Sequence, residues 1–295
     1  MVQIETSGTG RGEASELAAL ADFVSDHPRL FVLTGAGIST ASGIPAYRNA
    51  DGQWQRSEPI THQQFIASEA MRRRYWARSM VGWRTIAAAR PNAAHAALSR
   101  MQSTGRVEKL ITQNVDGLHQ SAGSADVIEL HGNLHQVVCL QCGGVESRSA
   151  IQELLQQRNP LVALQSATVA PDGDAHLEHG IDGFVVPECP GCGGVLKPDV
   201  VFFGGNIPRD RVAAASEALD VSDAMLVVGS SLMVYSGYRL CETARAGGKP
   251  IAAINRGRTR ADDVLQLKVD ADCGDALRHV CATVCPEAAT APTVP

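Results

Sequence analysis

The fold is first indicated by the run Leu30-Phe31-Val32-Leu33-Thr34-Gly35-Ala36-Gly37-Ile38-Ser39. Its first five residues form a nearly continuous apolar stretch that stops at a glycine, which is typical of a parallel strand buried on both faces. Gly35 and Gly37 match the first half of a dinucleotide-binding fingerprint, in which one glycine permits a sharp turn and the next lets the backbone approach a pyrophosphate. Thr40 takes the place of the third glycine, so this motif alone leaves the ligand open.

Similar apolar runs recur along the chain, with helical patterns between several of them. Strands are expected at 109–112, 126–130, 224–228, 250–254 and 264–269, and helices at 13–24, 91–104, 209–219 and 238–246. Alternating strands and helices predict an α/β fold, in which a parallel sheet is covered by helices on both faces. Two stretches, 47–90 and 133–197, break this alternation and are expected to form a small zinc-ribbon and helical domain. The larger domain should comprise 14–46, 91–132 and 198–285, with flexible termini at 1–13 and 286–295.

The composition favours a globular protein in a reducing compartment. The chain has 295 residues, 44% of them hydrophobic, and its net charge of −5 argues against nucleic acid as a partner. No apolar run approaches the roughly 18 residues of a membrane span. Glu5 and Glu13 in the polar N-terminal segment argue against a signal or transit peptide. Eight cysteines are too few for a disulfide scaffold, so we expect a cytoplasmic protein.

Two cysteine pairs carry the strongest metal signal. Cys139 and Cys142 form one C-x-x-C motif, Cys189 and Cys192 form another, and two glycines follow each pair. Four thiolates at this spacing are typical of a tetrahedral zinc site of the ribbon type. Because four cysteines leave no coordination position for water, we expect one structural zinc ion.

Polar residues follow several of the expected strands. Gln113, Asn114 and Asp116 come directly after 109–112, at the sheet edge where open α/β folds bind ligands. The alternative is that they only cap the next helix. His131 follows another strand and is a candidate general base, although a lone histidine is more often structural. Gly229-Ser230-Ser231 offers small side chains and amides to a phosphate or ribose.

Taken together and in this order, these motifs resemble the sirtuin family of NAD-dependent protein deacylases. The resemblance covers roughly residues 30–274 and includes Ser42-Gly43-Ile44-Pro45 with Arg48, and His131-Gly132. Finer features at 74–78, 171–174 and 235–239 resemble the class II, sirtuin-4-like branch, and we expect a bacterial member of it.

The resemblance implies that NAD and an acyl-lysine peptide meet in a cleft between a Rossmann-type domain and a small zinc domain. The NAD-binding residues that it implies are Gly35, Ala36, Gly37, Ile38, Ser39, Ile44, Pro45, Tyr47, Arg48, Trp54, Gln113, Asn114, Val115, Asp116, Gly229, Ser230, Ser231, Asn255, Arg256, Gly257 and Cys273. The peptide would add as a strand between two segments, with contacts from Phe203, Gly204, Gly205, Val234 and Tyr235.

The implied reaction transfers the acyl group from lysine to ADP-ribose. The acyl oxygen attacks the ribose C1′ and nicotinamide leaves, with Asn114 orienting the reacting centre. His131 then takes a proton from the ribose hydroxyls, and water releases lysine and O-acyl-ADP-ribose. Acetyl, long-chain, lipoyl and dicarboxylic acyl groups all remain open.

Other functions are weighed against this one. Mono-ADP-ribosyl transfer to protein uses the same C1′ chemistry and is the main alternative. A non-catalytic, nucleic-acid-binding zinc ribbon conflicts with the acidic net charge. A dehydrogenase is disfavoured because no acidic ribose partner follows the glycines at the usual distance of about 20 residues. We expect a monomer that acts on acyl-lysine proteins or peptides, without nucleic acid or membrane as a partner.

Overall fold

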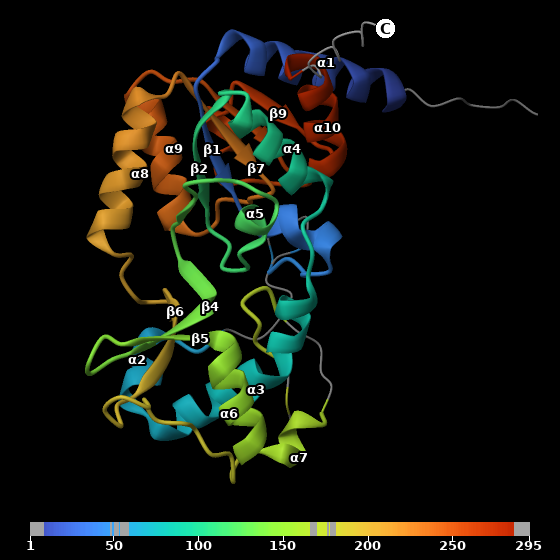
Figure 1. Ribbon diagram of the computed structural model, residues 1–295. Coiled ribbons are helices and arrows are strands. Elements are labelled where there is room, and N and C mark those ends of the chain that lie inside the picture. Colours follow the sequence, from blue (N-terminus) through green and yellow to red (C-terminus); the bar gives the residue numbers. More distant parts are fainter. Residues whose placement is uncertain are drawn as a thin grey trace, which may run out of the picture.

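The computed structural model describes residues 9–47, 49, 53, 59–165, 170–175, 177 and 181–285. They form two lobes, each built around its own sheet (Figure 1). The large lobe holds a six-stranded sheet, and the small lobe holds a three-stranded one. α1 begins at Thr9, before the boundary that we expected at residue 14.

The large sheet is parallel, with strand order β3-β2-β1-β7-β8-β9. Its strands are β1 (Leu30–Thr34), β2 (Val107–Thr112), β3 (Ile128–Glu129), β7 (Ala224–Val228), β8 (Ile251–Ile254) and β9 (Leu267–Val269). The chain runs outward from β1 to β3 and then returns to β7 on the other side of β1. The β1–β7 edge is therefore the switch point, where doubly wound folds bind ligands.

Helices cover both faces of this sheet. α1 (Thr9–Asp26), α4 (Ala93–Ser103) and α10 (Cys273–Val284) pack on one face, and α8 (Arg209–Val221) and α9 (Tyr235–Ala246) on the other (Figure 1). Leu30 and Val32 of β1 contact the first group, and Phe31 and Leu33 contact the second. Since side chains alternate along a strand, burial on both faces explains the unbroken apolar run.

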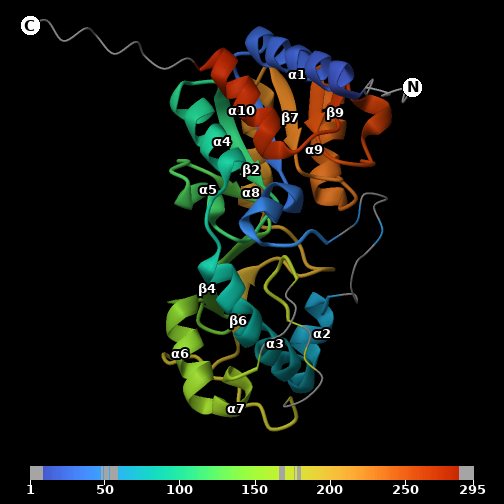
Figure 2. The same ribbon diagram turned by 90° about the vertical axis from the view of Figure 1, so that its right-hand side faces the viewer.

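The small lobe is a mixed α/β unit. β4 (Gly132–Cys139) lies between β5 (Val145–Ser147) and β6 (Leu196–Val200) in an antiparallel sheet. α2 (His62–Ala67), α3 (Glu69–Ala88), α6 (Arg148–Arg158) and α7 (Pro160–Ala163) surround it (Figure 2). Trp76 is fully buried in the hydrophobic core of this lobe.

Three short helical segments complete the described elements: η1 (Ala36–Ser42), α5 (Leu118–Ser121) and η2 (Asp262–Val264). η2 shortens the last expected strand, because Thr259 donates to Asp262 and turns the chain before Leu267. No helix among the described residues is both long and apolar enough to cross a membrane.

Candidate active site

A cavity of about 830 Å³ is lined by residues of both lobes. The large lobe contributes the loops after β1, β2, β7 and β8, all at the carboxyl edge of the sheet. The small lobe contributes Tyr47, Tyr75, Pro171, Asp172 and Asp174. The switch point of the sheet therefore opens into the cavity, as the fold predicts.

The glycines after β1 are required by the neighbouring loop after β7. The Gly37 amide donates a 2.8 Å hydrogen bond to the Gly229 carbonyl. A Cβ on Gly37 would lie 2.8 Å from that oxygen, and one on Gly35 would lie 2.7 Å from the Ser230 Cβ. The fingerprint glycines thus serve close packing of two loops, and both residues still line the cavity.

The polar residues after β2 form a buried network at the cavity floor. The Ser39 hydroxyl donates to Asp116 Oδ2 at 2.7 Å, and Asn114 Nδ2 donates to the Gly35 carbonyl and to Ser39 Oγ, both at 3.1 Å. Asp116 Oδ1 also accepts from the Leu118 amide at 3.0 Å, at the start of α5. Asp116 thus accepts from the first amide of α5 and also lines the cavity.

His131 lies in the cavity wall with both ring nitrogens in contact. Nδ1 is 2.9 Å from the Gln113 carbonyl and Nε2 is 2.8 Å from the Ser236 hydroxyl. A carbonyl only accepts, so Nδ1 carries the proton and Nε2 offers its lone pair to Ser236. Burial lowers the pKa of His131 below 6.5, the Gln113 hydrogen bond opposes this, and Arg211 reinforces it. The ring is neutral at pH 7, with a basic nitrogen.

Most of the predicted ligand-binding residues come together here. Those that line the cavity are Gly35, Ala36, Gly37, Ser39, Ile44, Tyr47, Gln113, Asn114, Val115, Asp116, His131, Phe203, Gly204, Gly205, Gly229, Ser230, Ser231, Val234, Tyr235, Asn255, Arg256 and Cys273. Ile38 faces the core of the large lobe instead, and Pro45 and Gly257 do not line the cavity. Arg48 and Trp54 lie outside the described residues.

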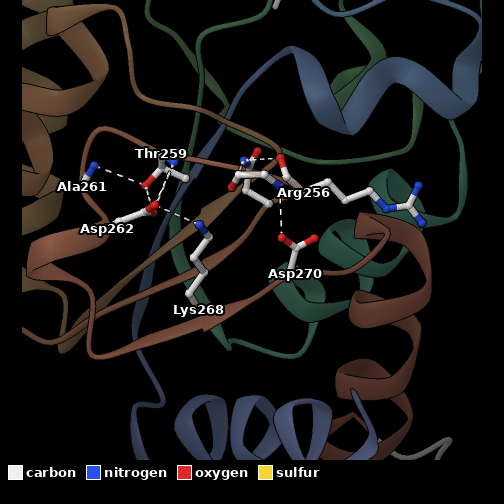
Figure 3. Close-up of polar contacts among 8 residues, drawn as sticks. Arg256, Thr259, Ala261, Asp262, Lys268 and Asp270 are labelled. Atoms are coloured by element: carbon white, nitrogen blue, oxygen red, sulfur yellow. Dashed lines mark hydrogen bonds and ion pairs between the residues drawn. The ribbon is translucent and has the colours of Figure 1, made fainter. Parts of the chain in front are cut away.

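The loop after β8 is fixed by its own polar contacts (Figure 3). Gly257 donates its amide to Asp270 Oδ2 at 3.2 Å, and Asn255 Nδ2 donates to the Arg256 carbonyl at 2.9 Å. Gly257 thus supports the loop rather than lining the cavity. The Arg256 side chain extends away from these contacts (Figure 3), and the residue lines the cavity.

The four cysteines converge at the tip of β4. Their sulfur atoms all lie within 4.8 Å of one another, with 3.5 Å between Cys139 and Cys192 and 3.8 Å between Cys142 and Cys189. Zinc–sulfur bonds of about 2.3 Å in a tetrahedron require sulfur atoms about 3.8 Å apart, so the donor set fits zinc. Gly143 and Gly193, at φ of 70° and 72°, make the tight turns that follow each cysteine pair.

The sequence analysis missed one wall of the cavity. Tyr75, Asp172 and Asp174 line it from the small lobe, and Asp174 pairs with Arg78. The sequence marks the segment 171–174 only by its resemblance to the class II branch. Two acids in four residues of an insert were the signal that could have found this wall.

Comparisons with known proteins agree with this geometry. A model of the Sir2 family matches residues 35–236. A Bordetella bronchiseptica protein named NAD-dependent protein deacetylase is 57% identical over 267 residues, which cover 90% of this chain and 97% of that protein.

Solved structures of Sir2 proteins have the same fold as this chain. A structure determined for the mechanism and regulation of Sir2 enzymes has a TM-score of 0.74 and 31% identity, covering 92% of this chain and 98% of its own. A Sir2 complex with p53 peptide and NAD+ has a TM-score of 0.70 and 30% identity, covering 90% and 96%. The class II placement stays a prediction. Because of the family match and these identities, the chain belongs to the Sir2 family, the sirtuins.

Proposed function

We propose that this protein is an NAD-dependent protein lysine deacetylase that transfers the acyl group to ADP-ribose and releases nicotinamide. One observation carries the proposal: a neutral His131, with Nε2 held by Ser236, lies in a cavity whose floor is the Ser39–Asn114–Asp116 network. The deacetylase name of the Bordetella relative supports the same activity.

The residues present fit NAD as a co-substrate. Gln113 Nε2 donates to Ser230 Oγ at 2.8 Å, which joins the loops after β2 and β7 at the switch point. Hydroxyl, amide and carboxylate groups there match the donors and acceptors of a ribose and a carboxamide. When bound, NAD supplies an electrophilic ribose carbon and a leaving nicotinamide. His131 Nε2 would accept a proton from a hydroxyl in the cavity, replacing its contact with Ser236.

Two segments that line the cavity are placed to pair with a peptide substrate that adds as a strand. Phe203–Gly205 and Val234–Tyr235 both line the cavity, and Val234 and Tyr235 are 36% and 54% exposed. α2 fixes the first segment, since His62 donates its amide to the Phe203 carbonyl and Gln63 Nε2 donates to that of Gly204. We infer that acyl-lysine proteins or peptides are the substrates.

The proposal also covers the cellular compartment and the oligomeric state of the protein. None of the eight cysteines forms a disulfide, which supports a reducing, cytoplasmic compartment. We propose a monomer, because both walls of the cavity and His131 come from one chain.

Nicotinamide release from NAD, measured with and without an acetyl-lysine peptide, tests the activity. We expect release to require the peptide and His131→Ala to lose at least about 100-fold in kcat/KM. His279→Ala, at an exposed position on α10, is the matched control. Mass analysis should find O-acetyl-ADP-ribose. Full activity of His131→Ala, or ADP-ribosylated protein as the main product, would overturn the proposal, and the latter would favour the transferase.

A further inference from the structure

The segment between the cysteine pairs returns to the cavity as a short loop. Residues 170–175, here called the insert loop, rise from the small lobe toward the large one (Figure 2). Pro171, Asp172 and Asp174 of this loop line the cavity beside Tyr47 and Tyr75. The insert loop thus builds a wall that the mechanism described above does not use.

Buried contacts fix the insert loop against α3. Arg78 Nη2 pairs with Asp174 Oδ2 at 2.7 Å, and Arg78 Nε donates to the Ala175 carbonyl at 2.8 Å. The side chains of Arg78 and Asp174 are only 9% and 8% exposed. Losing either partner would leave a buried charge uncompensated, so the pair holds the loop in place.

Asp172 lines the cavity, and no cation in the part of the chain that the structure describes forms an ion pair with it. Its donors in the described residues are neutral: its own amide, the Asp174 amide and the Tyr47 hydroxyl. Burial raises the pKa of Asp172, and Arg78, which is already paired with Asp174, opposes this only in part. Asp172 and Asp174 therefore both lie near the guanidinium of Arg78, and Asp172 adds a negative charge to this wall when it is ionised.

This acidic wall lies next to the segment proposed for peptide binding. The ring of Tyr47 meets that of Phe203 edge-on, with 6.4 Å between centroids, and Tyr47 donates to Asp172. The ring centroids of Tyr75 and Phe202 are 5.0 Å apart. A lysine side chain that enters past Phe203 would bring its acyl end toward Tyr47 and Asp172.

We infer that Asp172 is a specificity-determining residue that excludes acyl groups ending in a carboxylate and accepts neutral ones, including those whose end donates a hydrogen bond. The inference rests on the proposed function, because it names the substrate class of the same site. A carboxylate close to Asp172 would meet a like charge in a partly desolvated cavity, which costs far more than in water.

Two peptides of the same length separate charge from size: one carries glutaryl-lysine, and the other carries the same acyl group ending in a primary amide. The wild-type protein should prefer the amide by at least about tenfold in kcat/KM and in peptide affinity without NAD. Asp172→Asn should narrow that preference by about tenfold. Asp182→Asn removes the same charge from an exposed position outside the insert loop, between the two cysteine pairs. It should leave the preference for the amide unchanged.

Equal use of the two peptides by the wild-type protein would overturn the inference, even if Asp172→Asn failed to fold. An unchanged preference in a folded Asp172→Asn variant would also overturn it. Nicotinamide release with an acetyl-lysine peptide tests the proposed function separately. The affinity measurements need no turnover, so they would still test the acidic wall if that release were absent.

Discussion

The Gly229 backbone lies directly against Ile38: a Cβ placed on Gly229 would be 2.4 Å from the Ile38 amide nitrogen. Gly229 also has a φ of 62°, in the left-handed region that favours glycine. At Gly229 and Ile38, the loops after β1 and β7 therefore approach each other through their backbones. Any side chain here would separate the two halves of the ligand-binding edge.

Gly229→Ala should therefore destabilise the protein and weaken NAD binding. We expect a loss of several kcal/mol in the free energy of unfolding, because the clash is with backbone that cannot rotate away. Gly248→Ala is the matched control, since its φ is 68° and nothing lies within 4 Å of the added Cβ. It should cost about 1 kcal/mol. Urea unfolding measures both, and equal losses would contradict the close-approach argument.

The pH dependence of activity should follow His131. The pKa of its ring is lowered from 6.5 by burial, and the ring must be neutral to accept a proton. The acid limb of kcat/KM should therefore lie below pH 6.5. A limb above that value would contradict the assignment.

Arg211 provides a check on that limb, because its charge also lowers the pKa of His131. Arg211→Gln should move the acid limb to higher pH, toward the ordinary histidine value. Arg209→Gln, an exposed change on the same helix, should leave the limb in place. Identical profiles for the two variants would show that Arg211 does not act on His131.

Local features of the sequence predicted the large lobe well. β1 and β7 have the predicted bounds, because strands buried on both faces need unbroken apolar runs. The last strand begins later than expected, because Asp262 accepts from Thr259 and turns the chain first. His131 and the four cysteines carry recognisable chemistry at recognisable spacings, so the zinc cluster was also predictable.

The small-lobe wall was not predictable in this way. Arg78 and Ala175 are 97 residues apart in sequence, and no local pattern marks their contact. The packing role of Gly37 was likewise not predictable, since only the folded chain brings the loop after β7 against it. Contacts between distant segments decide which polar residues face the cavity.

The zinc cluster should be structural. Cys139→Ser removes one of four thiolates, and we expect loss of bound zinc together with a large fall in thermal stability. Cys241→Ser changes another buried cysteine, outside the cluster, and should keep one equivalent of zinc even if it is destabilised. Metal analysis and thermal unfolding measure the two effects. A stable, zinc-free Cys139→Ser protein would contradict a structural role.

Acid should destabilise the protein through a buried pair of histidines. His95 and His119 are buried with their ring centroids 4.8 Å apart, and His119 Nε2 is 2.9 Å from Thr34 Oγ1. Burial, reinforced by His95, lowers the pKa of His119 from 6.5 to about 3. Burial also lowers the pKa of His95. Both rings are therefore neutral in the folded protein but take up protons in the unfolded chain as pH falls below 6.5.

The direction in which stability changes with pH follows from proton binding. Between pH 6.5 and 3 the unfolded state holds more protons on His119, so stability is complete above pH 6.5 and decreases below it. His119 alone should cost about 2 kcal/mol at pH 5. Urea unfolding at pH 7 and pH 5 measures this loss. His119→Gln, which cannot titrate, should lose about 2 kcal/mol less between the two pH values than the wild type. The exposed change His279→Gln should behave like the wild type, and equal losses in all three proteins would show that His119 is not responsible.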